Sequence, residues 1–392
     1  MIEQLKKEER DVKLKVNSLL SKKHKHECLF PECNKASISS HSISKSVLKP
    51  LLKNNHIISP QFNRAKCDEN SLRGKEINLS FKEIGLDKAS TFKGFCSEHD
   101  NNVFSNIDNR GIVTNRDIFL QLYRSANKFF FTDKQINNAE IDVLGYEYET
   151  NTEYDSNLII NLEKIIFLIN DLLVDFPELD QIIHIKKDDT LSIKPFSKKI
   201  NIDVEITYKK LNFVIPVAME KCFKLHLDNE HSESLIIITP SKDHTNIIIL
   251  CHPNITPQYL KEMRSEIRTL NLIESILMQD SDFYLTPSVF DGWDEEKKEV
   301  IINDFYFYNE RKFLEEYELS IFDDVREKLC FNLSEEKRVH ELKKIYSKPQ
   351  RDPIEVRNNR LWSFTNKGRQ AKILLTGNTT GACYPIDETI FL

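Results

Sequence analysis

The sequence has few glycines and no long apolar run, and these two absences exclude several classes of protein. Glycine occupies nine of the 392 positions, which excludes collagen-like repeats and linker-rich chains. The two most apolar stretches, residues 158–174 and 235–251, are both interrupted by charged and polar side chains. A membrane span needs about 20 mostly apolar residues in a row. With 40% hydrophobic residues, we expect a globular chain of two or three domains that does not enter a membrane.

The sequence also lacks a secretory signal and a disulfide framework. The first ten residues, MIEQLKKEER, contain no apolar core, so the expected location is the cytoplasm. Four of the eight cysteines stand alone late in the chain and are predicted to be core residues; they are Cys222, Cys251, Cys330 and Cys383. The early cysteines lie close to histidines, a pattern that favours metal binding in a reducing compartment.

Charge is distributed unevenly along the chain. Residues 1–130 carry 23 Lys and Arg against 15 Asp and Glu, whereas residues 131–392 carry 32 against 46. A basic N-terminal part on an acidic remainder is typical of a nucleic-acid-binding module joined to a module that does not touch the nucleic acid. Charge alone is equally compatible with a solvated lysine-rich face.

Hydrophobic periodicity divides the chain into four regions and predicts an α+β fold. We expect an amphipathic helix in residues 1–23, a Cys/His-rich module in 24–112, a helical connector in 113–180 and a mixed, mostly antiparallel α/β region in 181–392. Within these regions the pattern predicts helices over residues 116–130, 157–174 and 257–276, and a hairpin formed by 232–239 and 241–250. The last region is predicted to sense a signal or to oligomerise.

Two short segments of the Cys/His-rich module have the spacing of metal ligands. Cys28 and Cys33 bracket a proline turn, so that both thiolates can converge on one ion. Cys96 and His99 follow Gly94, which permits a tight turn, and open a predicted helix. Two such pairs suit a tetrahedral, structural Zn²⁺ site. The alternative is a set of free cysteines with a surface histidine.

Between the two pairs lies the segment ISSHSISKSVLKPLL, which places His41 at the end of a predicted strand. A zinc knuckle, a strand that ends in histidine and a Cys-x-x-His turn that enters a helix together resemble the zinc-stapled, treble-clef branch of the HNH (His-Me finger, ββα-metal) nucleases. The resemblance covers residues 24–110. It implies a zinc-bound ββα module with an insertion around residues 54–90.

The resemblance also implies catalytic roles. His41 takes the position of the general base, and Asp100, or Asn101 in its place, takes that of the ligand to a catalytic Mg²⁺ or Mn²⁺. Imidazole has a pKa near neutrality, as a base at neutral pH requires. Ser40 stands where many family members carry an acidic residue or a second histidine. The asparagine that orients the base in the family has two candidates here, Asn63 and Asn78.

The same resemblance implies a metal-dependent endonuclease, for which DNA is favoured over RNA as the substrate although the sequence does not decide between them. The layout, a nuclease module joined to a larger α/β region of opposite charge, resembles that of anti-phage defence effectors and implies control by the C-terminal region. Five basic residues of the module are candidate phosphate contacts; they are Lys45, Lys49, Arg64, Lys66 and Lys93. A homodimer through the leading helix and an unknown small-molecule or protein trigger are further expectations. The alternative function is a non-catalytic zinc finger that binds nucleic acid or a protein partner.

Overall fold

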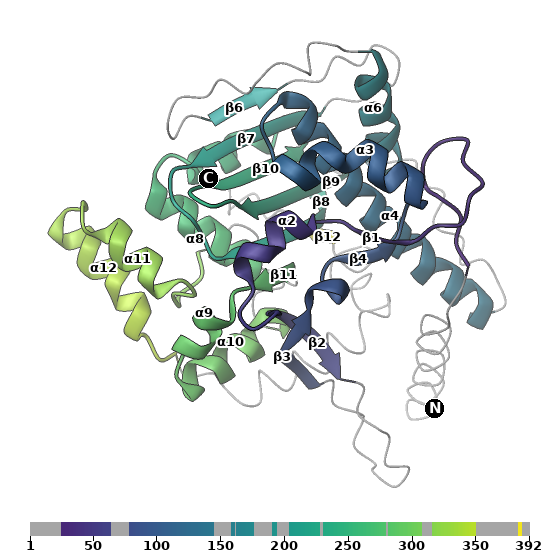
Figure 1. The fold of residues 1–392 in the computed structure, drawn as a ribbon. Coiled ribbons are helices and arrows are strands. Elements are labelled where there is room, and N and C mark those ends of the chain that lie inside the picture. Colours follow the sequence, from purple (N-terminus) through teal and green to yellow (C-terminus); the bar gives the residue numbers. More distant parts are fainter. Residues whose placement is uncertain are drawn as a thin grey trace, which may run out of the picture.

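A large, mostly antiparallel sheet forms the centre of the molecule (Figure 1). The computed structural model describes residues 25–63, 78–144, 158–160, 162–175, 190–193, 204–227, 230–279, 281–307, 316–349 and 383–385. Strands follow the order β3-β2-β11-β8-β9-β10-β7-β6, and β5 and β12 pair parallel with β9 and β8. Their bounds are β2 (His56–Asn63), β3 (Asn78–Gly85), β5 (Leu158–Ile160), β6 (Thr190–Ile193), β7 (Glu205–Leu211), β8 (Val217–Leu227), β9 (Glu230–Pro240), β10 (Thr245–Cys251), β11 (Asp282–Leu285) and β12 (Cys383–Pro385).

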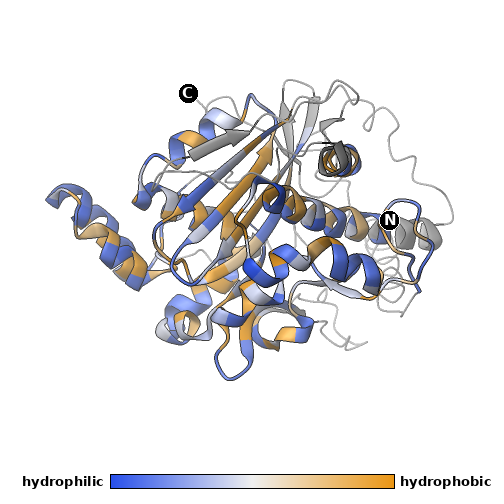
Figure 2. Ribbon diagram, turned by 45° about the horizontal axis from the view of Figure 1, so that its top comes forward, coloured by the Kyte–Doolittle hydropathy of each residue, from blue (hydrophilic) through white to orange (hydrophobic). Residues whose placement is uncertain are grey.

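Helices cover both faces of this sheet (Figures 1 and 2). The helices on one face are α3 (Ser97–Arg110), α4 (Asn115–Leu144) and α6 (Leu162–Asp175), whereas the other face carries α7 (Thr256–Glu262), α8 (Glu266–Leu277), α9 (Pro287–Gly292), α10 (Glu295–Phe307) and α11 (Asp323–Cys330), followed by α12 (Glu335–Tyr346). Alternate residues of one strand serve the two cores: Ile236 and Ile238 pack toward α8, and Leu235 and Ile237 toward α4. Coverage on both faces explains why β9 and β10 are continuous apolar runs.

The α+β prediction is confirmed, and so is the hairpin, because β9 and β10 pair antiparallel. The predicted helices differ in extent. The helix predicted over residues 116–130 continues to Leu144, since neither glycine nor proline interrupts the sequence there. The helix predicted over 257–276 is two helices, because Ser265 caps α8 by accepting a hydrogen bond from the Arg268 amide. The start of the helix predicted over 157–174 is strand β5.

A second, two-stranded sheet carries the Cys/His-rich segment. It pairs β1 (Ser39–His41) antiparallel with β4 (Thr91–Lys93), and α3 follows directly. Between β1 and β4 lie α2 (Lys45–Leu48), η1 (Lys49–Leu51), η2 (Leu86–Lys88) and the hairpin β2–β3. This hairpin joins the large sheet through the pair Ile58 and Leu285. The segment expected to be an insertion therefore links the small sheet to the C-terminal part of the chain.

Within the described residues, no helix combines the length and the apolar character that crossing a bilayer requires. The leading helix predicted for residues 1–23 lies outside the described residues. The division of the chain into four regions stays a prediction.

Candidate metal centre and its neighbouring histidine

Cys28 and Cys33 lie at the two ends of a narrow turn. The chain enters and leaves it through a bridge between Glu27 and Ala36, and the Cys28 amide donates to the Lys35 carbonyl at 2.9 Å. At the tip, the Cys33 amide donates to the Phe30 carbonyl at 3.2 Å. Glu32 adopts the left-handed region with φ of 59°, a conformation that places both cysteine side chains on the same side of the turn at a cost in backbone strain.

Cys96 and His99 come from the start of α3. Cys96 is the N-cap residue, and His99 lies in the first turn. Gly94 precedes them for a reason of packing: a Cβ atom there would lie 2.5 Å from the Phe92 ring. The turn was predicted to need glycine for its backbone conformation, but the close approach of Phe92 is what excludes a side chain.

The four side chains form one cluster. Their ligand atoms all lie within 4.8 Å of one another. The Cys28 sulfur is 3.4 Å and the Cys96 sulfur 3.5 Å from His99 Nδ1, and the sulfurs of Cys33 and Cys96 are 4.0 Å apart. Ligands about 2.0–2.3 Å from a tetrahedral ion lie roughly 3.5–3.8 Å from each other. The cluster could therefore hold a metal ion, and three sulfurs with one imidazole nitrogen are compatible with zinc.

Hydrogen bonds and packing fix these ligands from outside. The Cys96 amide donates to the Cys28 sulfur at 3.1 Å, and the Phe30 ring stacks on the His99 ring with 4.0 Å between centroids. An amide that donates to a ligating sulfur stabilises the thiolate, and a stacked ring holds the imidazole in one orientation. Lys35 and Glu98 form an exposed ion pair across the two segments.

The electrostatic surroundings of the two buried cysteines differ. Burial raises the pKa of Cys28 to about 11, despite the hydrogen bonds from backbone amides. The pKa of Cys96 is lowered, chiefly by the backbone amide of His99 at the start of α3. A metal ion binds the thiolate form. Metal binding must therefore displace a proton from Cys28, and the affinity rises with pH.

His41 lies beside this cluster, at the end of β1. Its side chain is 8% exposed, and Nδ1 lies 2.8 Å from the Ala89 carbonyl oxygen. Because a carbonyl only accepts, Nδ1 carries the hydrogen and Nε2 of the neutral ring keeps its lone pair. Burial lowers the pKa of His41, and the charges of Lys45 and Arg124 lower it further, whereas Asp100 opposes them. The ring is thus kept neutral at neutral pH.

Asp100 follows His99 in the first turn of α3, on the side of α4. Its carboxylate lies 3.3 Å from Arg124, and the same guanidinium contacts Asp108 at 2.7 Å. Arg124 is almost fully buried, with a side chain 2% exposed. The charges of Asp100 and Arg124 act on the pKa of His41 in opposite directions, the carboxylate raising it and the guanidinium lowering it.

The other residues predicted for the site are less closely gathered. The Asn101 side-chain amide donates back to the Ser97 carbonyl at 2.7 Å, on the exposed side of α3. Ser40 accepts a hydrogen bond from the Phe95 amide at 3.1 Å and so supports the turn between β4 and α3. Asn63 and Asn78 pair with each other at the far end of the β2–β3 hairpin. The acceptor that orients His41 is instead the main chain of Ala89.

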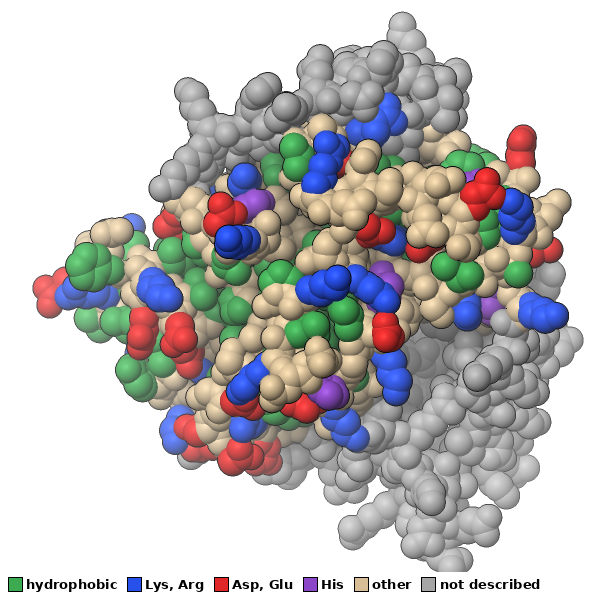
Figure 3. All heavy atoms as spheres, in the orientation of Figure 1, with side chains coloured by type: hydrophobic (Ala, Val, Ile, Leu, Met, Phe, Trp, Pro, Cys, Tyr) green, Lys and Arg blue, Asp and Glu red, His purple; other side chains and the backbone are tan. Residues whose placement is uncertain are grey.

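Several basic side chains are exposed in the segments that follow β1 and in or beside β4. Lys45, Lys49 and Lys93 are exposed, as is Lys88 beside them, and Lys45 pairs with Asp87 at 2.7 Å. Figure 3 shows Lys and Arg side chains gathered over α2, η1 and η2 in the middle of this face. Arg64 and Lys66 lie outside the described residues.

Sequence reasoning missed Arg124, Asp108 and Asp87. Arg124 is one of two basic residues on the face of the predicted helix 116–130 opposite its apolar residues, where solvent exposure is the simplest expectation. Its burial depends on Asp100 and Asp108, which come from another helix. No local sequence pattern predicts that Arg124 pairs with these two carboxylates. Asp100 and Asp108 lie about two turns apart on α3, where two nearby negative charges favour a cation between them.

Comparisons of the chain with protein-family models, with curated proteins and with solved structures give no match.

Proposed function

We propose that this protein is a metal-dependent endonuclease of the HNH type that hydrolyses phosphodiester bonds in DNA. The observation that carries the proposal is the arrangement of β1, β4 and α3 around one Cys/His cluster. His41, at the end of β1, is held by the Ala89 carbonyl, and Asp100 lies in the first turn of α3. A ββα unit with a histidine at the end of its first strand and a ligand on its helix is what the resemblance predicts.

The chemistry follows from the two side chains. His41 Nε2 accepts a proton from the water that attacks phosphorus, and the Ala89 carbonyl stabilises the imidazolium through Nδ1. Asp100 would hold a Mg²⁺ or Mn²⁺ ion, and such an ion would neutralise charge on the phosphate and on the leaving oxygen. Among the described residues, the Cys/His cluster is the one group of three or more His, Cys, Asp or Glu side chains whose ligand atoms converge. Asp100 is therefore proposed as a single protein ligand of the second ion.

Zinc has a structural part in this proposal. It joins the Cys28–Cys33 turn to the start of α3, which is the helix that carries Asp100. Lys45, Lys49, Lys88 and Lys93 supply phosphate contacts around His41. The C-terminal region, which shares the large sheet with the β2–β3 hairpin, controls the module.

One observation favours a second function, a zinc finger that binds nucleic acid without cleaving it. Asp100 is already paired with Arg124, and Ser40 is turned toward Phe95, so a catalytic ion would have to compete with a guanidinium for its carboxylate. Both functions predict binding to DNA. They differ only in hydrolysis.

The test is the nicking of supercoiled plasmid by zinc-loaded protein with Mg²⁺ or Mn²⁺. We expect the wild type to cleave and His41→Ala to lose at least about a hundredfold in rate, since general-base catalysis contributes about 10²–10⁴-fold. His56→Ala is the matched control, because His56 is exposed on β2 and its ring lies 2.8 Å from the carbonyl oxygen of the nearby Asn54. Binding to the plasmid without cleavage by any of the three proteins would establish the zinc-finger function instead.

A further inference from the structure

Directly after His41, the chain is tied to a buried carboxylate of the large sheet. The Ser42 hydroxyl lies within hydrogen-bond distance of the Ser90 carbonyl, at 3.1 Å, and also donates to the carboxylate of Glu220 on β8. Ser42 and Glu220 are both fully buried. A residue adjacent to the proposed base is thus bonded to a strand that otherwise has no part in the site.

Hydrogen bonds between residues 42–43 and Ser90 fix the position of the Ala89 carbonyl, which accepts the hydrogen bond from His41. The Ser42 amide donates to the Ser90 carbonyl at 2.8 Å, and the Ile43 amide donates to the Ser90 hydroxyl at 3.2 Å. In return, the Ser90 hydroxyl donates to the Ile43 carbonyl at 2.9 Å. Ser90 follows Ala89, whose carbonyl accepts from His41, and it is held in the left-handed region with φ of 52°. Such a conformation persists only where the surroundings enforce it.

The carboxylate that holds Ser42 is itself fixed from two other elements. Lys128 of α4 pairs with Glu220 and, at 2.5 Å, with Asp282 of β11. The nearby negative charges of Asp282 and Glu220 raise the pKa of Lys128 against the opposing effect of its burial. The second oxygen of Glu220 is buried without a hydrogen-bond partner among the described residues. The hydrogen bond from Ser42 and the ion pair with Lys128 therefore offset the desolvation cost of the buried Glu220 carboxylate.

We propose that Ser42 and Glu220 are positioning residues for His41, through which the large sheet sets the orientation of the base. The inference rests on the proposed function, because it assigns a regulatory connection to the same site. A shift of β8 relative to α4 would change the Glu220–Ser42 contact, release the turn at Ser90 and move the Ala89 carbonyl that selects the His41 tautomer. The C-terminal part of the chain thereby acts on catalysis through the Ser42–Glu220 hydrogen bond and the His41–Ala89 hydrogen bond.

Ser42→Ala is the principal test, because it removes one hydroxyl and leaves Lys128 paired with both of its carboxylates. Glu220→Gln is the second variant. Ser320→Ala is the control, since it deletes a buried hydroxyl without a hydrogen-bond partner in the described part of the chain, between Leu319 and Ile321 of the core that contains α8. Two quantities are measured on the zinc-loaded full chain. They are kcat and KM for plasmid cleavage, and the ¹⁵N shifts of the His41 ring, which report its tautomer.

We expect kcat to fall by at least about tenfold in Ser42→Ala and Glu220→Gln with little change in KM, because misplacement of a catalytic group lowers the rate of the chemical step. The ring of His41 should change from the single Nδ1–H tautomer to a mixture, whereas Ser320→Ala matches the wild type in both measurements. Wild-type kcat and a wild-type ring spectrum in Ser42→Ala would overturn the inference. If the wild type does not cleave DNA, the proposed function fails and the ring spectra alone decide the coupling.

Discussion

The small β1–β4 sheet and the large central sheet differ in how they are built. Each face of the large sheet is covered by helices, and its strands place alternate Ile and Leu side chains in two apolar cores. The β1–β4 sheet has three residues in each strand; Phe92 and Phe95 pack it against the core that α4 covers, and the Ser42 hydroxyl ties it to Glu220 of β8. The comparison shows that the candidate site lies on a sheet of few backbone pairs that depends on the core and the strands of its neighbours.

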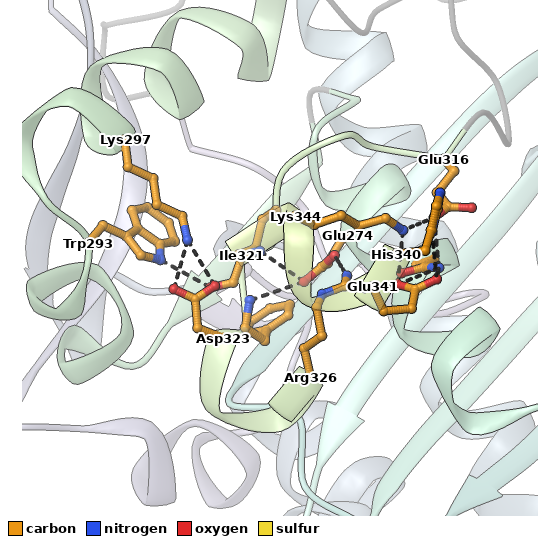
Figure 4. Close-up of polar contacts among 12 residues, drawn as sticks. Glu274, Trp293, Lys297, Glu316, Ile321, Asp323, Arg326, His340, Glu341 and Lys344 are labelled. Carbon is orange, nitrogen blue, oxygen red and sulfur yellow. Dashed lines mark hydrogen bonds and ion pairs between the residues drawn. The ribbon is translucent and has the colours of Figure 1, made fainter. Parts of the chain in front are cut away.

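Both parts contain buried ions, but with different partners. Beneath His41, Glu220 and Lys128 connect β8 to α4. In the large sheet's helical layer, Arg326 of α11 pairs with Glu274 of α8 and with Glu341 of α12 (Figure 4). The Glu274 carboxylate also accepts hydrogen bonds from the backbone amides of Ile321 and Phe322. The second network joins α11 and α12 to the core and touches none of the residues of the proposed site.

Removal of zinc should have the largest effect and should separate the two regions. Structural zinc sites contribute on the order of 10 kcal/mol to folding, and the three-residue strands of the small sheet offer few backbone hydrogen bonds to replace that contribution. Chelation, or Cys33→Ser, should therefore raise amide exchange in residues 26–41 and 91–110 and leave exchange in residues 235–251 unchanged. Hydrogen exchange measured by mass spectrometry checks this. Equal loss of protection in both regions would show that the two sheets fold as one unit.

Arg326→Met should destabilise the region of the large sheet while zinc stays bound. The substitution leaves Glu274 without its buried cation and Glu341 with Lys344 as its buried partner; loss of a buried partner costs about 3–5 kcal/mol in comparable cases. Urea unfolding followed by circular dichroism measures the loss. Arg338→Met, at an exposed position of α12, is the matched control and should leave the free energy of unfolding unchanged. Equal midpoints for the two variants would contradict a structural role for the network.

Gly94→Ala should weaken the zinc-binding region alone. A Cβ atom at this position lies 2.5 Å from the Phe92 ring, so the ring or the turn before Cys96 must move, at a cost of about 1–3 kcal/mol. Competition with a chromogenic chelator should show weaker zinc binding. Gly85→Ala places its Cβ in open space, so it serves as the control. Unchanged zinc affinity in Gly94→Ala would mean that the turn adapts without cost.

Glu32→Gly should have the smallest effect, and it should be stabilising. Glu32 holds φ of 59° at the tip of the Cys28–Cys33 turn, where glycine avoids about 1 kcal/mol of backbone strain. Zinc affinity should rise slightly. Glu32→Ala removes the same carboxylate but keeps the strain, so a gain of equal size in both variants would assign the effect to charge instead.

Features that depend on residue spacing and hydrophobic periodicity could be predicted from the sequence. The four metal ligands stand in two local pairs, and the structure brings these pairs together. The β9–β10 hairpin was predicted because two apolar runs flank a short turn. The cap at Ser265 was missed, although a serine before Glu266 is a local signal.

What the sequence did not predict depends on partners distant in the chain. Arg124 and Lys128 are charged residues opposite the apolar face of their helix, and only the fold supplies the carboxylates that bury them. The acceptor of His41 is a backbone carbonyl, which no side-chain motif encodes. The three-residue strand β5 forms because β9 offers it an edge, so its pairing overrides the local helical pattern.

The most direct test of the central claim is Mn²⁺ binding, followed by electron paramagnetic resonance, to zinc-loaded wild type, Asp100→Asn and Asn101→Ala. Asp100 is the proposed ligand of the second ion, whereas the Asn101 side chain donates to the Ser97 carbonyl. We therefore expect one bound Mn²⁺ in the wild type and in Asn101→Ala, and loss of both that ion and plasmid cleavage in Asp100→Asn. Wild-type Mn²⁺ binding and cleavage in Asp100→Asn would contradict the claim that His41 and Asp100 form one site.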